Sequence, residues 1–186
     1  MKLVISLLFL SLLSAPTLAK EYIYQGKVQG MVCAFCVYSV SKKIAQLPQV
    51  DAQSINVDLK SGTISFRSKA KMGFKKVSRL FAETGFKLTV FNEVKQAALK
   101  TVAYQAKPIM SFKLENLDVE KYEAILSSIG DIAASSLGKL VIIAPSSVEI
   151  AILKPMIMGK QKIARVQYQT EKQLNSIEIK LFLRAN

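Results

Sequence analysis

The feature that most constrains the fold is a change in apolar periodicity between residues 21 and 91. Over residues 21–28 and 53–67, apolar and polar side chains alternate, which is typical of strands with one buried face. Two other segments carry apolar residues at helical spacing. These positions are Val37, Val40, Ile44 and Leu47 in the first segment, and Phe74, Val77, Leu80 and Phe81 in the second. The pattern predicts strands interleaved with two helices.

Turn and breaker residues separate these elements. The first helix is expected from about Cys36 to Leu47, where Pro48 stops it, and Lys60-Ser61-Gly62 suits the tight turn of a hairpin. Gly85 suits a left-handed cap after the second helix, and a last strand is expected over residues 86–91. The order β-α-β-β-α-β predicts an α+β, ferredoxin-like domain with two helices on one face of a four-stranded antiparallel sheet.

The two cysteines of the chain, Cys33 and Cys36, lie where a loop is expected to become the first helix. Thiols at this spacing can bring two soft sulfur ligands onto one metal ion, while the helix N-terminus stabilises the thiolates. A disulfide across two residues closes a small loop and stabilises little. A resting disulfide or a redox pair stays open as the alternative.

Residues from about 22 to 91 resemble a heavy-metal-associated domain, the module of copper chaperones and of the periplasmic mercury-binding protein of mercury resistance. The resemblance rests on the Gly-Met-x-Cys-x-x-Cys loop and on Gly85-Phe86, and it does not extend to the rest of the chain. The matching loop residues are Gly30, Met31, Cys33 and Cys36. The resemblance implies that Cys33 and Cys36 are the metal ligands.

Four residues are expected to support the site. Gly30 loosens the loop, and the resemblance implies that Met31 is a buried support beneath it. Phe86 lies where family members place an aromatic residue or a lysine near the metal, and Lys87 would offset the charge of a two-thiolate complex. Core packing for Phe86 and an ordinary surface position for Lys87 are the alternatives.

Ligand chemistry narrows the metal to Cu(I) or Hg(II), one ion per N-terminal domain, because two thiolates suit soft ions of low coordination number. Zinc prefers four ligands, and the chain has no histidine. Zinc- and cadmium-binding relatives often carry an acidic residue where this chain has Val32. The predicted function is carriage or sequestration by thiolate exchange, without catalysis, with a metal transporter or other metal-accepting protein as partner. A thiol-disulfide oxidoreductase and a metal-independent adaptor are the alternatives.

Residues 1–19 predict a cleaved secretory signal. Lys2 precedes an apolar stretch, Leu3 to Leu13, and Pro16 comes before a small-residue ending at Ala19. The apolar stretch is shorter than a membrane-spanning helix requires. We therefore expect export and a periplasmic location.

The chain is strongly basic, with 26 Lys and Arg against 13 Asp and Glu, a net charge of +13. Such a surface favours acidic partners, including an anionic membrane surface. Export and the lack of a basic motif interleaved with aromatic residues argue against nucleic acid. The protein is expected to be a monomer or a metal-bridged dimer.

The expected organisation is a signal peptide over residues 1–19, the heavy-metal-associated domain over 20–93, a linker over 94–107 and a second α+β domain over 108–186. A degenerate ferredoxin-like unit is one expectation for the second domain, whose role the sequence does not indicate. Its apolar pattern predicts strands at 109–114, 140–144, 166–169 and 177–182, a helix that Gly130 ends or interrupts, and a short helix before Pro155.

Three methionines of the second half, Met110, Met156 and Met158, carry thioethers that bind Cu(I) without forming disulfides. Met156 and Met158 would lie on one face of an extended segment. Core or surface packing is the alternative for all three.

Overall fold

The structure is a computed structural model that describes residues 20–95, 102–161, 163 and 165–185. The expected signal peptide and residues 96–101 of the expected linker lie outside the described residues. Within the described part of the chain, no helix is long and apolar enough to cross a membrane.

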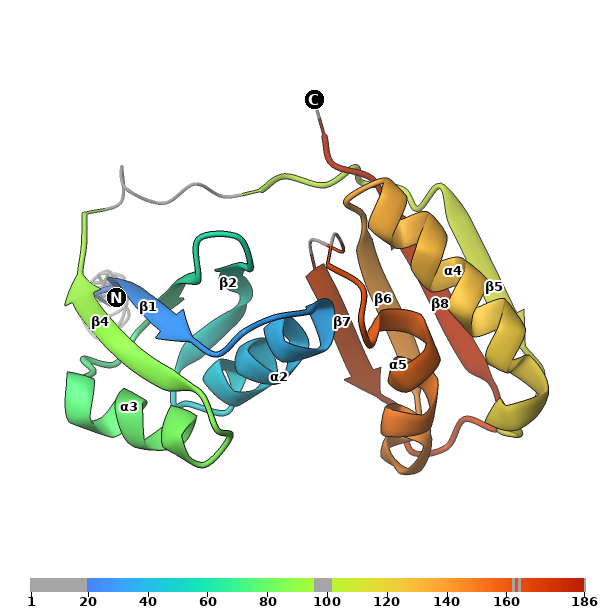
Figure 1. Cartoon of the computed structure of the whole chain (residues 1–186), viewed down its shortest axis with the longest axis horizontal. Coiled ribbons are helices and arrows are strands. Elements are labelled where there is room, and N and C mark those ends of the chain that lie inside the picture. The colour runs from blue at the N-terminus through green and yellow to red at the C-terminus, as the bar shows by residue number, and fades with distance from the viewer. Residues whose placement is uncertain (1–19, 96–101, 162, 164, 186) are drawn as a thin grey trace, which may run out of the picture.

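The N-terminal half has the βαββαβ order that its periodicity predicts. Its sheet has the strand order β2-β3-β1-β4 with antiparallel neighbours, which is the ferredoxin-like arrangement (Figure 1). The core between sheet and helices includes Val37, Ile44, Phe66 and Phe81. The elements are β1 (Tyr22–Gln29), α2 (Ala34–Ala45), β2 (Val50–Asp58), β3 (Thr63–Ser68), α3 (Phe74–Ala82) and β4 (Lys87–Glu93).

Two glycines fulfil the predicted turn roles. Gly62 has φ +66° in the β2–β3 hairpin, and Gly85 has φ +77° just after α3, a backbone region that other residues rarely adopt. The expected start of α2 at about Cys36 is wrong by two residues. Cys33 has the extended backbone of an N-cap residue, φ −155° and ψ 171°, so the helix begins at Ala34.

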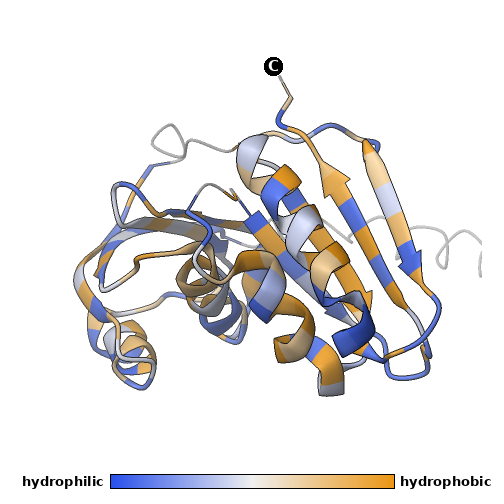
Figure 2. Cartoon of the chain, turned by 45° about the vertical axis from the view of Figure 1, so that its right-hand side comes forward, coloured by the Kyte–Doolittle hydropathy of each residue, from blue (hydrophilic) through white to orange (hydrophobic). Residues whose placement is uncertain are grey.

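The second half is also α+β, but the expectation of a degenerate ferredoxin-like unit is wrong. Its sheet has the order β5-β8-β6-β7, in which β6 and β7 are parallel and β8 is antiparallel to both β5 and β6. Each of the helices α4 and α5 therefore connects two parallel strands. Apolar and polar residues alternate along β8, in the middle of the sheet (Figure 2). The elements are β5 (Met110–Leu114), η3 (Val119–Tyr122), α4 (Glu123–Ser135), β6 (Lys139–Ala144), η4 (Ser146–Val148), α5 (Glu149–Ile157), β7 (Arg165–Thr170) and β8 (Ile177–Phe182).

Neither helix of this half ends where a breaker residue predicts. Helix α4 passes through Gly130, and α5 includes Pro155 in its last turns. A Cβ at Gly130 would lie 1.9 Å from the carbonyl oxygen of Met156, so the glycine is required by the close approach of α4 to α5. Packing between the two helices therefore overrides the weak helix propensity of glycine at this position.

We expect Gly130→Ala to destabilise the protein by about 1–3 kcal/mol, because the added methyl overpacks the contact between α4 and α5. Helix propensity alone would give the opposite sign, a gain of up to about 1 kcal/mol. Urea unfolding of the variant measures the effect. Ser128→Ala, at an exposed position of the same helix, is the matched control. A Gly130→Ala variant as stable as the original protein would contradict the close packing.

Candidate metal site

The two cysteines lie together at the N-terminal end of α2. Cys33 is the N-cap residue and Cys36 lies in the first turn, so a spacing of three places both on the same side of the helix. Their sulfur atoms are 3.5 Å apart, and both are free thiols with partly buried side chains. Since zinc–thiolate bonds are about 2.3 Å long, two sulfurs at this separation are close enough to share one ion.

The loop that presents the cysteines is shaped by the residues expected to support it. Gly30 has φ +97°, and a Cβ at this position would come within 3.4 Å of the Phe86 ring. Met31 and Phe86 are partly buried and pack against the N-terminal core. Lys87 is exposed at the start of β4, opposite Gln29 at the end of β1. The structure thus brings Gly30 and Phe86 together beside the cysteine loop.

The electrostatic surroundings favour a thiolate at Cys33. Burial opposes ionisation, but the N–H groups of Cys36, Gly159 and Phe35, together with the Cys36 thiol, outweigh it and hold the pKa of the Cys33 thiol below its ordinary value. The first turn of α2 contains no acidic side chain. A thiolate is therefore the negative charge that the helix dipole stabilises there.

The second half of the chain contributes directly to this environment. The Ala34 N–H, next to Cys33, donates a 2.6 Å hydrogen bond to the carbonyl oxygen of Lys160, just after α5. The Gly159 N–H is among the groups that lower the pKa of Cys33. The sequence gives no signal for this contact, because over 120 residues separate the two segments and the contacting groups are backbone atoms.

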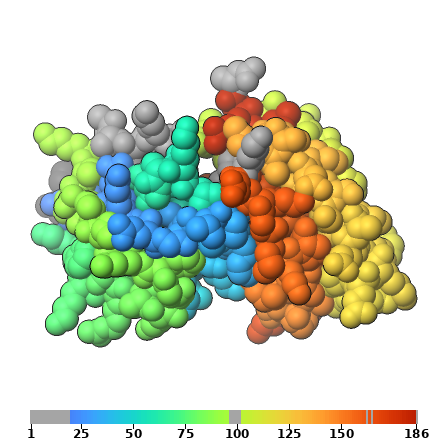
Figure 3. All heavy atoms as spheres, in the orientation of Figure 1, coloured from blue at the N-terminus to red at the C-terminus, as the bar shows by residue number. Residues whose placement is uncertain are grey.

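Helix α2 is docked against the second half along its length. Ala34 and Tyr38 are buried in the core of the second half, and Phe35 packs against it. The Tyr38 hydroxyl and the Lys42 ammonium both donate to the buried carboxylate of Glu149, at the start of α5. In Figure 3 the atoms of the α2 segment (blue) and those around α5 (orange) meet at the boundary between the halves.

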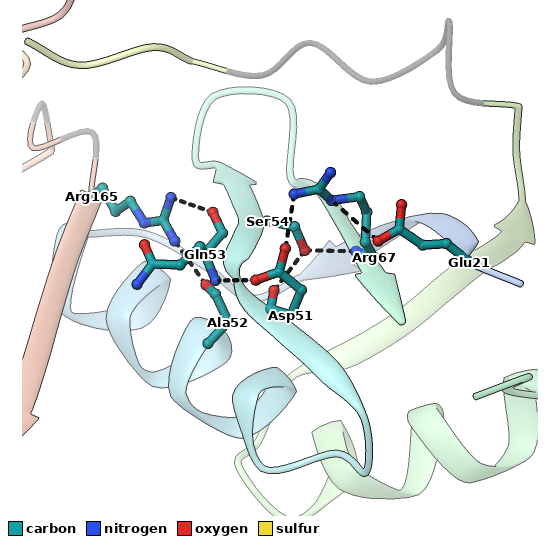
Figure 4. Close-up of polar contacts among 7 residues, drawn as sticks. All are labelled: Glu21, Asp51, Ala52, Gln53, Ser54, Arg67 and Arg165. Carbon is teal, nitrogen blue, oxygen red and sulfur yellow. Dashed lines mark hydrogen bonds and ion pairs between the residues drawn. The ribbon is translucent and has the colours of Figure 1, made fainter. Parts of the chain in front are cut away.

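A second set of polar contacts joins β7 to β2. The guanidinium of Arg165 donates to the carbonyl oxygens of Gln53 at 3.0 Å and Ala52 at 2.8 Å (Figure 4). On the other side of β2, Arg67 forms an ion pair with Asp51 at 2.8 Å. The two halves therefore meet through α2 and through the edge strand β2.

The methionines of the second half do not form the paired thioether site that their spacing suggests. Met156 is fully buried in the core of the second half, whereas Met158 follows the end of α5 and is 49% exposed. The extended segment expected there is wrong, because Met156 lies within the helix. Met110 is partly buried and packs on the same core.

The described residues contain no cluster of three or more His, Cys, Asp and Glu side chains that could hold a metal ion. Of these four residue types, the α2 N-terminus therefore offers two donors, the sulfurs of Cys33 and Cys36. Such a pair suits a soft ion of low coordination number, and it can also close as a disulfide if oxidised.

Comparison with known proteins identifies one family. Residues 27–87 match the heavy-metal-associated domain. A crystal structure of oxidized MerP from Ralstonia metallidurans CH34 is similar over 38% of this chain and 97% of its own, with 22% sequence identity and a TM-score of 0.34. No curated protein matches the chain at a significant level.

We expect the Cys33 thiol to react with iodoacetamide at a lower pH than an ordinary cysteine, whose pKa is about 8.5, because its folded surroundings favour the thiolate. Alkylation of the reduced protein across a pH series, with mass-spectrometric fragmentation to separate the two sulfurs, measures this. The same series in urea is the control, since unfolding removes the N–H groups around the sulfur. Equal pH profiles for Cys33 in the folded and unfolded protein would contradict the prediction.

Proposed function

Residues 27–87 form a heavy-metal-associated domain, and from this premise we propose that the chain binds a soft metal ion through Cys33 and Cys36 and passes it on by thiolate exchange. The observation that carries the proposal is the pair of free sulfurs, 3.5 Å apart, at the N-terminus of α2. The role is one of binding and transfer, and it requires no chemical turnover.

The donor set favours Cu(I) or Hg(II), with one ion per N-terminal domain. Both ions accept two thiolates in a low-coordinate complex, whereas zinc requires further ligands. The 186 residues include no histidine, and Val32, beside Cys33, offers an exposed apolar side chain. The loop therefore supplies sulfur without the harder donors that zinc would need.

Transfer follows from the partial exposure of the two cysteines. An incoming thiolate or thioether bonds to the ion while both resident sulfurs are still attached, and the resident thiolates then leave one at a time. The ion keeps its oxidation state throughout, and each departing thiolate takes up a proton or stays ionised. A free metal ion never has to enter solution.

The proposed setting is the periplasm, after removal of the leader near Ala19, and the proposed recipient is a metal transporter or another metal-accepting protein. The basic composition of the chain, +13 over the full sequence, favours acidic partners and an anionic membrane surface. The protein acts as a monomer, or as a dimer bridged by the metal ion. The proposed domain limits are 20–93 and 108–186, with residues 94–107 as the linker between them.

A thiol-disulfide oxidoreductase is the second candidate function. It is favoured by the lowered pKa of Cys33 beside a second thiol, since a stabilised thiolate is the attacking species in disulfide exchange. The metal-carrier role differs from it in requiring tight metal binding by the reduced protein.

Titration of the reduced protein with Cu(I) and Hg(II), in competition with a chelator of known affinity, tests the proposal. We expect one ion to bind per chain, and we expect binding to be lost in the Cys33→Ser/Cys36→Ser variant because both thiolates are removed. Met110→Leu is the control, because it removes a sulfur from the second half without touching the cysteine loop.

Equal metal binding by the original protein and the double-serine variant would contradict the proposal. A reduction potential in the range of known oxidants, measured together with no metal affinity, would establish the oxidoreductase instead.

A further inference from the structure

The turn after α5 is fixed against the cysteine loop. The Lys160 carbonyl oxygen accepts a 2.6 Å hydrogen bond from the N–H of Ala34, the residue next to Cys33. Contacts within the second half also hold the turn in place. The Lys160 N–H bonds to the carbonyl oxygen of Ile157, and the Lys160 ammonium pairs with Asp131 of α4. Backbone and side-chain contacts together hold this turn against Ala34, the residue that follows Cys33.

Met158 is the residue of this turn that carries a soft donor. It follows the last residue of α5 with an extended backbone, φ −64° and ψ 130°, and it lies two residues before Lys160, whose carbonyl oxygen bonds to Ala34. Its side chain is 49% exposed, in contrast to the fully buried Met156. With three rotatable bonds and no place in the core, the thioether can adjust its position toward the cysteines.

The docking of the halves makes this proximity a fixed property of the folded chain. Glu149, at the first turn of α5, accepts hydrogen bonds from Tyr38 and Lys42 of α2. Lys160 bonds to Ala34 at the first residue of α2. Two contacts, one at each end of α5, therefore hold its C-terminal end at the start of α2 (Figure 1).

We propose that Met158 supplies a third, thioether ligand to an ion held by Cys33 and Cys36, so that the metal site is completed by the second half of the chain. The inference rests on the proposed function. A thioether is neutral and soft, and it joins two thiolates around Cu(I) without adding charge. Hg(II) bound by two thiolates gains less binding affinity from an added thioether. The site is accordingly selective for Cu(I) over Hg(II), and Met158 is the ligand that an incoming thiolate displaces first.

Met158→Leu tests the assignment, since leucine keeps the size and apolar character of the side chain but removes the sulfur. Met110→Leu is the matched control in β5. The reduced full-length proteins are titrated with Cu(I) and with Hg(II) in competition with a chelator. The Cu(I)-loaded proteins are then examined by X-ray absorption at the copper edge to count sulfur neighbours.

We expect Met158→Leu to weaken Cu(I) binding by at least about tenfold, because loss of an outer-shell partner alone costs about 10–100-fold in metal affinity, while Hg(II) binding stays within about twofold. Copper should have three sulfur neighbours in the original protein and in Met110→Leu, and two in Met158→Leu. Unchanged Cu(I) affinity and two sulfur neighbours in every protein would overturn the role of Met158 and leave the two-cysteine site standing. If every protein, including the double-serine variant, bound Cu(I) equally well, the proposed function would be overturned as well.

Discussion

Helix α2 is the element on which the rest of the structure depends, because two hydrophobic cores share it. Val37, Val40 and Ile44 are buried in the core of the N-terminal half. Ala34 and Tyr38, on another face of the helix, are buried in the core of the second half. A helix buried on two sides cannot turn about its axis without exposing apolar surface from one of the cores. The cysteines at its N-terminus are therefore presented in one fixed direction.

This arrangement explains why the second half reaches the cysteine loop. Glu149 binds Tyr38 and Lys42, so the start of α5 meets the middle of α2, and the turn at 158–160 then meets its beginning. The Glu149 side chain is nearly fully buried, and breaking such a partnered charge is costly. The turn after α5 thus lies against the cysteine loop of the other half, and this proximity is the basis for assigning Met158 to the same site.

The sequence predicts the N-terminal half well because its signals are local. Alternation in β1, helical spacing in α2 and the left-handed glycines at 62 and 85 each act within a few residues. The sequence does not predict those features that depend on packing between segments far apart in the chain. Position 130 lies within α4 and must be glycine, because the Met156 backbone leaves no room for a Cβ. Strand β8 inserts between β5 and β6, which no local pattern encodes. The cysteine pair could be predicted from its spacing, whereas the Lys160 contact could not.

The contact between Lys160 and Ala34 implies that the second half is docked on the start of α2 in solution. The amide exchange rate of Ala34 tests it most directly, because the first N–H groups of a helix have no partner within the helix, and the bond to Lys160 is what protects this one. Hydrogen exchange followed by NMR on the reduced chain should show the Ala34 amide exchanging as slowly as that of Val40, in the middle of the helix. Rapid exchange at Ala34 with a protected Val40 would show an intact helix that the second half does not cover, and would contradict the docking of the two halves.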